Sequence, residues 1–257
     1  MPTTNTLLRQ FRWKTDGWVI GIALFAPTVM TWLYFFVLAG QGMLTRVVYF
    51  TSKVLTGLLP LYWYLMLRFQ VMRESEASDT PLPKPRHLLS FKLGLDFGLF
   101  TVAGMMVLYY VWLRDLPLLK STADLVHAKL LDAGVTSPTA FVVMAGFLTI
   151  IHSAFEEYYW RWFVFGRLRA GIPWMKAALV SSFGFMLHHI LVLYTFLPGE
   201  AGLLFVVMFS ICIGIGGFVW CCIYQHTGSL LGAWVAHLCA DLGIMWCGYD
   251  IVASKLG

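Results

Sequence analysis

Charged side chains are scarce in this sequence. They account for 12% of its 257 residues, against about a quarter in a typical soluble domain, whereas apolar residues account for 59%. A soluble fold could not bury that much apolar surface, so the shortage of charge indicates that the lipid bilayer is the solvent for most of the chain. We therefore predict an all-α integral membrane protein, a polytopic bundle that forms a single domain over residues 1–257.

Three further features are missing or rare. No basic cluster is interleaved with aromatic residues, which excludes nucleic-acid binding. No HExxH sequence occurs, so the helix that supplies two zinc ligands and a base in many metalloproteases is absent. The few cysteines lie in apolar stretches of the last third, and we interpret them as small hydrophobic residues rather than disulfide partners or zinc ligands. They are Cys212, Cys221, Cys222, Cys239 and Cys247.

Apolar runs of about 20 residues, the length that crosses a bilayer core, recur along the chain. The first is too long for the apolar region of a signal peptide, and no small-x-small cleavage site closes it, so we expect a retained span. We predict about seven spans, or eight if the second one splits. They run from Trp18 to Leu38, Arg46 to Leu67, Leu93 to Leu113, Ala140 to Phe165, Lys176 to Leu197, Ala201 to Tyr224 and Leu230 to Cys247.

The segment from Ser121 to Ala133 has a different pattern. Ser121 and Asp124 have the spacing of a capping box, the apolar residues that follow fall on one helical face, and Gly134 is a typical stop signal. Such a one-sided apolar helix is typical of the membrane interface. We predict a short interfacial helix here.

Lysine and arginine placement predicts the orientation. With the N-terminus in the cytoplasm, eleven basic residues at the ends of the spans fall inside and six fall outside. The sequence therefore predicts a multi-pass protein of the cell membrane (the inner membrane if the protein is bacterial). In this orientation the N-terminus and the loop 69–92 face the cytoplasm.

Acidic and basic side chains nevertheless occur deep in the fourth predicted span. A charged side chain at this depth costs on the order of 3 kcal/mol, so such residues must face protein or water. Glu157 and Arg161 are four residues apart and share a helical face, where they can pair. Glu156 lies about 100° round the helix and is available for chemistry, with His152 one turn before it on the same face.

Two later spans add more ionisable residues. The fifth span contains His188 and His189, and the seventh contains His237 and Asp241, again one helical turn apart. Counted from the predicted cytoplasmic ends, Glu156, His189 and His237 lie about 17, 20 and 14 Å deep at 1.5 Å per residue. A common depth on three helices predicts a shared site.

Three other intramembrane residues favour a plainer interpretation. An isolated histidine or aspartate in a bundle is usually a hydrogen-bonded packing residue, and we expect this role for His152, His188 and Asp96.

These polar residues resemble the three motifs of a known membrane family, the CAAX protease and bacteriocin-processing (CPBP or ABI) family, which includes the type II CAAX prenyl endopeptidases. The resemblance covers about residues 140 to 248, in the order of the family. Its motifs are EExxxR at Glu156, Glu157 and Arg161, Phe-xxx-His at Phe185 and His189, and His-xxx-Asn/Asp at His237 and Asp241.

The resemblance implies a catalytic core over residues 140–248 and a glutamate-type intramembrane endopeptidase. Glu156 and His189 would activate a water molecule, whereas His237 with Asp241 would stabilise the oxyanion. An ionised Asp241 cannot donate a hydrogen bond, so it would instead orient or protonate His237. Glu157 and Arg161 would support the site. The expected substrate is a membrane-anchored protein or peptide in the bilayer, and no metal or other cofactor is expected.

Two alternatives remain open. Histidines with a carboxylate can hold zinc with one position free, so a zinc-dependent intramembrane protease is the first. The second is a membrane immunity or scaffold protein without catalytic activity, in which the polar cluster only specifies helix packing.

Overall fold

A computed structural model describes residues 13–66 and 82–256, and these residues form helices joined by short connections. No strand occurs in this described part, which confirms the all-α class. Six helical segments are long and apolar enough to cross a membrane, so the chain is an integral, multi-pass membrane protein. The six segments are Gly17–Val37, His87–Leu113, Pro138–Leu168, Trp174–Phe196, Gly199–Thr227 and Leu231–Lys255.

Several of these segments alternate between α-helical and π-helical or 3-10 winding, the latter two written η. The elements are α1 (Trp13–Trp32), η2 (Leu33–Val37), α2 (Met43–Met66), α4 (His87–Leu108), η3 (Tyr109–Leu113), α5 (Pro117–Asp132), α6 (Pro138–Gly146), η4 (Phe147–His152), α7 (Ser153–Glu157), η5 (Tyr158–Phe165), α8 (Gly166–Leu168), α9 (Trp174–Phe196), α10 (Gly199–Thr227), α11 (Leu231–Val252) and η6 (Ala253–Lys255). The continuous segment Pro138–Leu168 is called the glutamate helix below.

Six of the seven predicted spans correspond to these membrane-length segments. The second is a helix as expected, α2, but it is not among the six. Its passage across the bilayer therefore stays a prediction, as does the orientation of the chain. Residues 69–81 of the predicted cytoplasmic loop lie outside the described residues.

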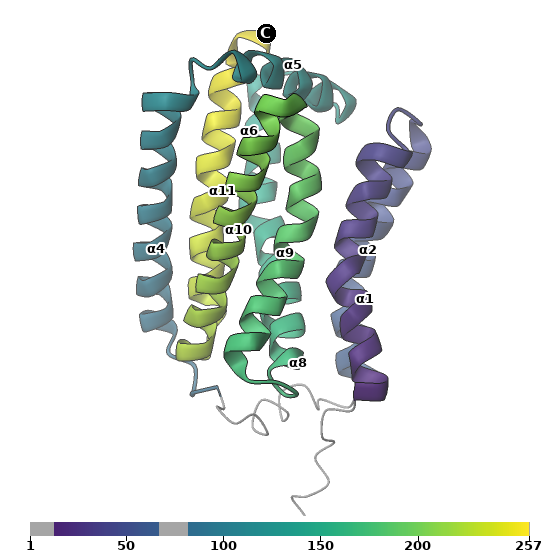
Figure 1. The fold of residues 1–257 in the computed structure, drawn as a ribbon, viewed down its shortest axis with the longest axis vertical. Coiled ribbons are helices and arrows are strands. Elements are labelled where there is room, and N and C mark those ends of the chain that lie inside the picture. The colour runs from purple at the N-terminus through teal and green to yellow at the C-terminus, as the bar shows by residue number, and fades with distance from the viewer. Residues whose placement is uncertain (1–12, 67–81, 257) are drawn as a thin grey trace, which may run out of the picture.

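The long helices run side by side, and α5 lies across one end of them (Figure 1). Within the bundle α11 packs against α4, and α9 packs against both α10 and α1. The first turn of α1 and the C-terminus lie at opposite ends of the bundle (Figure 1).

The predicted interfacial helix is present as α5, but its start differs from the prediction. The helix begins at Pro117, one turn before Ser121, because proline at the first helical position has the right φ and lacks only an N–H that would be unpaired there. Ser121 is therefore inside the helix, where its hydroxyl donates to the Leu118 carbonyl at 2.8 Å. The end agrees with the sequence, since Gly134 follows with a φ of +80°.

The contact between α4 and α11 depends on small residues. A Cβ atom built on Gly94 would lie 2.1 Å from the carbonyl oxygen of Gly232, which is too close for any side chain. Ser90 strengthens the same contact, since its hydroxyl donates to the Ser229 carbonyl at 3.0 Å and accepts from the Gly232 amide at 2.8 Å. Membrane helices associate through such close approach and hydrogen bonding, so α4 holds α11 in place.

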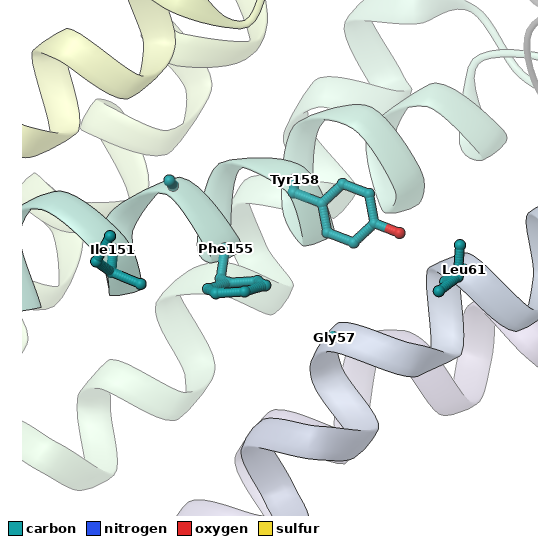
Figure 2. A pocket seen from close by; sticks show the side chains of 6 residues that line it. Gly57, Leu61, Ile151, Phe155 and Tyr158 are labelled. Atoms are coloured by element: carbon teal, nitrogen blue, oxygen red, sulfur yellow. The ribbon is translucent and has the colours of Figure 1, made fainter.

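A pocket of about 410 Å³ separates α2 from the glutamate helix. Figure 2 shows Phe155 and Tyr158 extending from the glutamate helix on the side that faces α2. The residues of the glutamate helix that line the pocket are spaced three or four positions apart, so they lie on one face of that helix. The lining residues are Gly57, Leu61, Ile151, Ala154, Phe155 and Tyr158.

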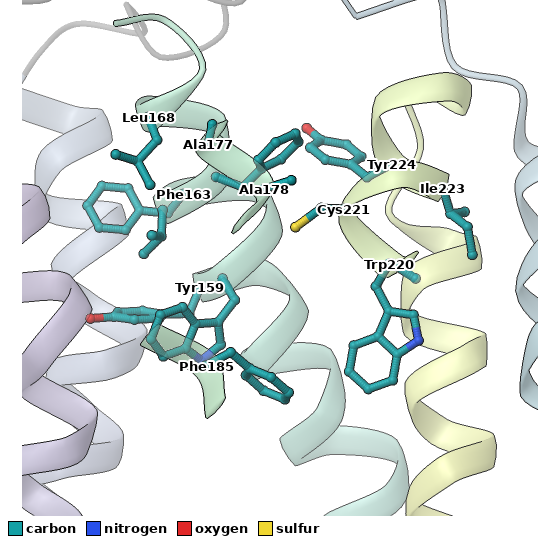
Figure 3. Packing of buried hydrophobic residues seen from close by; sticks show 14 of the residues in the cluster. Tyr159, Phe163, Leu168, Ala177, Ala178, Phe185, Trp220, Cys221, Ile223 and Tyr224 are labelled. Carbon is teal, nitrogen blue, oxygen red and sulfur yellow. The ribbon is translucent and has the colours of Figure 1, made fainter. Parts of the chain in front are cut away.

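Buried aromatic and small residues join the glutamate helix to α9, α10 and α11. Figure 3 shows part of this cluster, in which Phe185 of α9 lies between Tyr159 of the glutamate helix and Trp220 of α10. Ala177, Ala178 and Ala233 are fully buried and let the helices approach closely. All five cysteines are free, as expected. This cluster holds together the three helices that carry the predicted site.

Candidate active site

The glutamate helix changes its winding around its two carboxylates. Glu156 and Glu157 lie on α7, a short α-helical stretch between the π-helical η4 and η5. Such π-helical turns are rare in proteins, and those that do occur are often at functional sites. Ser181 of α9 donates to the Trp160 carbonyl at 3.0 Å and so satisfies a backbone acceptor in η5.

Glu157 is the centre of a buried ion-pair network. Its Oε1 accepts from Arg161 Nη1 at 2.9 Å and from His237 Nδ1 at 2.8 Å. The side chains of Glu157 and Arg161 are each only 1% exposed. The predicted pairing of these two residues is therefore present, and the pair also fixes the orientation of an imidazole on α11.

Arg161 lies between two aromatic rings. Its guanidinium carbon lies 4.5 Å from the ring centre of Phe185 and 4.7 Å from that of Trp220. Cation–π contacts of this kind offset part of the cost of removing a guanidinium from water. Gly217 leaves room for the group, because a Cβ atom there would lie 3.1 Å from Arg161 Nη2.

Glu156 faces a group of imidazoles. Its Oε1 lies 3.4 Å from His152 Nε2 and 3.5 Å from His188 Nε2, and its Oε2 lies 3.6 Å from His237 Nε2. The contact with His237 agrees with the shared site that the common depth predicts, whereas the contact with His188 is unexpected. The reason is that the rotation of α9 toward α7 cannot be derived from the spacing of the glutamate helix alone.

His189 is fixed by its own helix. Its Nδ1 donates to the Phe185 carbonyl at 2.8 Å, so the Nε2 atom carries the free lone pair. One ligand atom from each of Glu156, His188 and His189 lies within 4.8 Å of the other two. His189 is thus next to Glu156, although no direct hydrogen bond joins them.

His237 connects the two glutamates with Asp241. Because Glu157 accepts from its Nδ1, its Nε2 faces Glu156 Oε2 and Asp241 Oδ1, each at 3.6 Å. Trp220 stacks on the imidazole with ring centres 4.4 Å apart. A ring with protons on both nitrogens could donate to a carboxylate on each side.

The structure places all six predicted site residues close to one another. Four of them, Glu156, Glu157, His237 and Asp241, are linked by contacts of 3.6 Å or less, Arg161 pairs with Glu157, and His189 borders Glu156. Glu156 could act as a base on a water molecule, and His237 could donate a hydrogen bond to a carbonyl oxygen.

His152 and His188 lie closer to Glu156 than expected for residues that only pack. His152 could have been included from the sequence, since it is four residues before Glu156. His188 could not, because helical spacing does not show which of two adjacent histidines turns toward a neighbouring helix. Asp96 is exposed on α4.

Comparison with known proteins gives a family match. Residues 138–243 match the family described as type II CAAX prenyl endopeptidase Rce1-like, which confirms the resemblance that the three motifs indicate. The matched segment begins with the glutamate helix and includes most of α11. No curated protein and no solved structure matches the chain.

Proposed function

We propose that this chain, whose residues 138–243 match the family described as type II CAAX prenyl endopeptidase Rce1-like, cleaves a membrane-anchored protein or peptide by glutamate-dependent hydrolysis. The observation that carries the proposal is the meeting of Glu156, His189 and His237 from three helices. Burying three ionisable groups together in a membrane bundle is costly, and a catalytic role explains that cost.

Glu156 acts as the general base. It takes one proton from a water molecule whose other hydrogen is bonded to Nε2 of His189. The resulting hydroxide attacks the carbonyl carbon of the scissile peptide bond. The proton then passes from Glu156 to the leaving amine, so the carboxylate is restored. No covalent intermediate is needed in this sequence.

His237 stabilises the developing oxyanion. Its Nε2 faces the same space as Glu156 Oε2, and its ring is fixed by the bond from Nδ1 to Glu157. A donor that is already aligned needs no reorganisation during the reaction, which is the main source of its effect. Asp241 supports the protonated form of this ring, and Arg161 supports Glu157.

The substrate class follows from the surroundings. The residues directly beside Glu156 on the next helical face, Phe155 and Tyr158, line an apolar pocket between the glutamate helix and α2. An apolar segment of a substrate in the bilayer could occupy this pocket while its scissile bond reaches Glu156. This arrangement fits a substrate that is anchored in the membrane rather than a soluble peptide.

A comparison of membrane proteomes tests the proposal. A deletion strain is complemented either with the native chain or with Glu156→Gln, and the C-terminal and N-terminal ends of membrane proteins are identified. We expect the same uncut precursors in the deletion strain and in the Glu156→Gln strain. Identical processing in all three strains would contradict the proposal and favour a non-catalytic role.

A zinc-dependent protease is the second candidate, because Glu156, His188 and His189 could together hold an ion. A strong chelator separates the two mechanisms. Glutamate-dependent cleavage continues in its presence, whereas zinc-dependent cleavage stops.

A further inference from the structure

Three metal-binding side chains from two helices meet beside the proposed general base. Glu156 from α7 and the adjacent His188 and His189 from α9 each direct a ligand atom into a space where all three atoms lie within 4.8 Å of one another. A carboxylate with two imidazoles is a ligand set found at zinc sites that keep one coordination position open.

The spacing is close to what a zinc ion requires. Around a tetrahedral zinc with bonds of about 2.0–2.1 Å, ligand atoms lie roughly 3.3 Å apart. Glu156 Oε1 and His188 Nε2 are 3.5 Å apart. The other two separations are at most 4.8 Å, so His189 would have to shift toward the other two ligands to complete the set.

His189 is arranged as a metal ligand usually is, and His188 has a feature that packing alone does not explain. His189 donates its Nδ1 hydrogen to a backbone carbonyl, which leaves Nε2 for the ion, and this outer contact is typical of metal-bound histidines. His188 is held parallel to the Trp160 ring, with ring centres 5.7 Å apart. Its buried Nδ1 has no hydrogen-bond partner, which is unusual for a histidine whose role is only to pack.

We infer that Glu156, His188 and His189 form a binding site for a divalent transition-metal ion such as Zn²⁺, and that the bound ion inhibits cleavage. The inhibitory part rests on the proposed function. An ion on Glu156 and His189 occupies the carboxylate lone pair that would accept the proton and the imidazole that would hold the water. In the HExxH proteases the base is a separate glutamate that does not bind the metal, and Glu157, the nearest other glutamate, is already paired with Arg161.

Binding is measured without any substrate. The purified full-length chain in detergent is stripped with a chelator, dialysed, and titrated with Zn²⁺ by calorimetry, and with Co²⁺ as a coloured probe of tetrahedral coordination. We expect one ion per chain. His188→Gln should weaken Zn²⁺ binding by at least about tenfold. Even substitution of a residue that only contacts a metal ligand typically lowers metal affinity by about 10- to 100-fold.

His226→Gln is the matched control, because His226 is exposed near the end of α10, with its Nδ1 bonded to the Cys222 carbonyl. It should bind Zn²⁺ as the native chain does. Thermal unfolding of each variant shows whether it is folded. If His188→Gln does not fold, His188→Asn is titrated in its place, together with competition between Zn²⁺ and Co²⁺ on the native chain.

The inhibition is measured on the same proteins, each relative to its own rate without zinc. Zn²⁺ should stop cleavage by the native chain, a chelator should restore it, and His188→Gln should need at least about tenfold more Zn²⁺. Absence of binding, or binding that is unchanged in His188→Gln, overturns the metal site. Cleavage that rises with Zn²⁺ overturns the inhibition. If the chain binds Zn²⁺ but cleaves nothing, the metal site stands and the proposed function fails.

Discussion

The two adjacent glutamates should respond oppositely to the same substitution. Glu157 is buried with Arg161, and its Oε1 accepts from both Arg161 and His237. Replacing Glu157 with glutamine removes the only acidic partner that the described structure gives to Arg161. Glu156, in contrast, contacts imidazoles, and a glutamine there leaves no cation without a partner.

The magnitude follows from the burial of the pair. Breaking a buried ion pair by removing one partner typically costs about 3–5 kcal/mol, because the remaining charge stays buried. The rings of Phe185 and Trp220 offset about 1–2 kcal/mol of this cost through cation–π contact, but they do so in the native chain as well and therefore do not reduce the effect of the substitution. We therefore expect Glu157→Gln to lower the free energy of unfolding by roughly 3 kcal/mol or more.

A double substitution distinguishes the stranded charge from lost packing. Glu157→Gln with Arg161→Met leaves no buried charge in the pair and should recover part of the lost stability. Denaturant and thermal unfolding in detergent are measured for both single variants at the glutamates and for this double variant. A Glu156→Gln protein that unfolds more easily than Glu157→Gln, or a double variant less stable than Glu157→Gln alone, would refute the assignment of Glu157 as the structural partner.

Three further outcomes are expected. Gly94→Ala should destabilise the chain by about 1–3 kcal/mol or prevent folding, because its methyl group would overlap the Gly232 carbonyl. Gly104→Ala on the same helix meets open space and should unfold like the native chain. Equal unfolding curves for the two variants would contradict the close contact. Single cysteines at Ser78 and Ser121, in a chain without other cysteines, should be labelled from opposite sides of the membrane, and labelling from one side would reverse the predicted topology. Cleavage should persist in a strong chelator, and its loss together with one tightly bound zinc would favour the metal-dependent mechanism.

Much of the bundle could be predicted because the bilayer imposes simple rules. A span needs a long apolar run, so the membrane-length segments appear directly in the sequence. The pairing of Glu157 with Arg161 also follows from spacing within one helix. The clustering of Glu156, His189 and His237 could be predicted from their common depth.

The remaining features depend on how helices turn against one another. Nothing within α9 shows that His188 as well as His189 faces Glu156, since adjacent residues differ by only about 100°. The close contact of Gly94 with Gly232 joins residues that are far apart in the chain, and neither has a distinctive local pattern. The π-helical stretches on either side of Glu156 have no reliable sequence signal either, so their effect on side-chain direction could not be predicted.

The most direct test of the central claim is cleavage by the purified chain in liposomes. The substrate is a membrane-anchored precursor found by the proteome comparison, and the native chain is compared with Glu156→Gln after both are shown to unfold at the same temperature. We predict that the native chain cuts the precursor and that Glu156→Gln does so roughly 10²- to 10⁴-fold more slowly, the loss expected for a general base. Equal cleavage by the two folded proteins would contradict the claim that Glu156 activates the water.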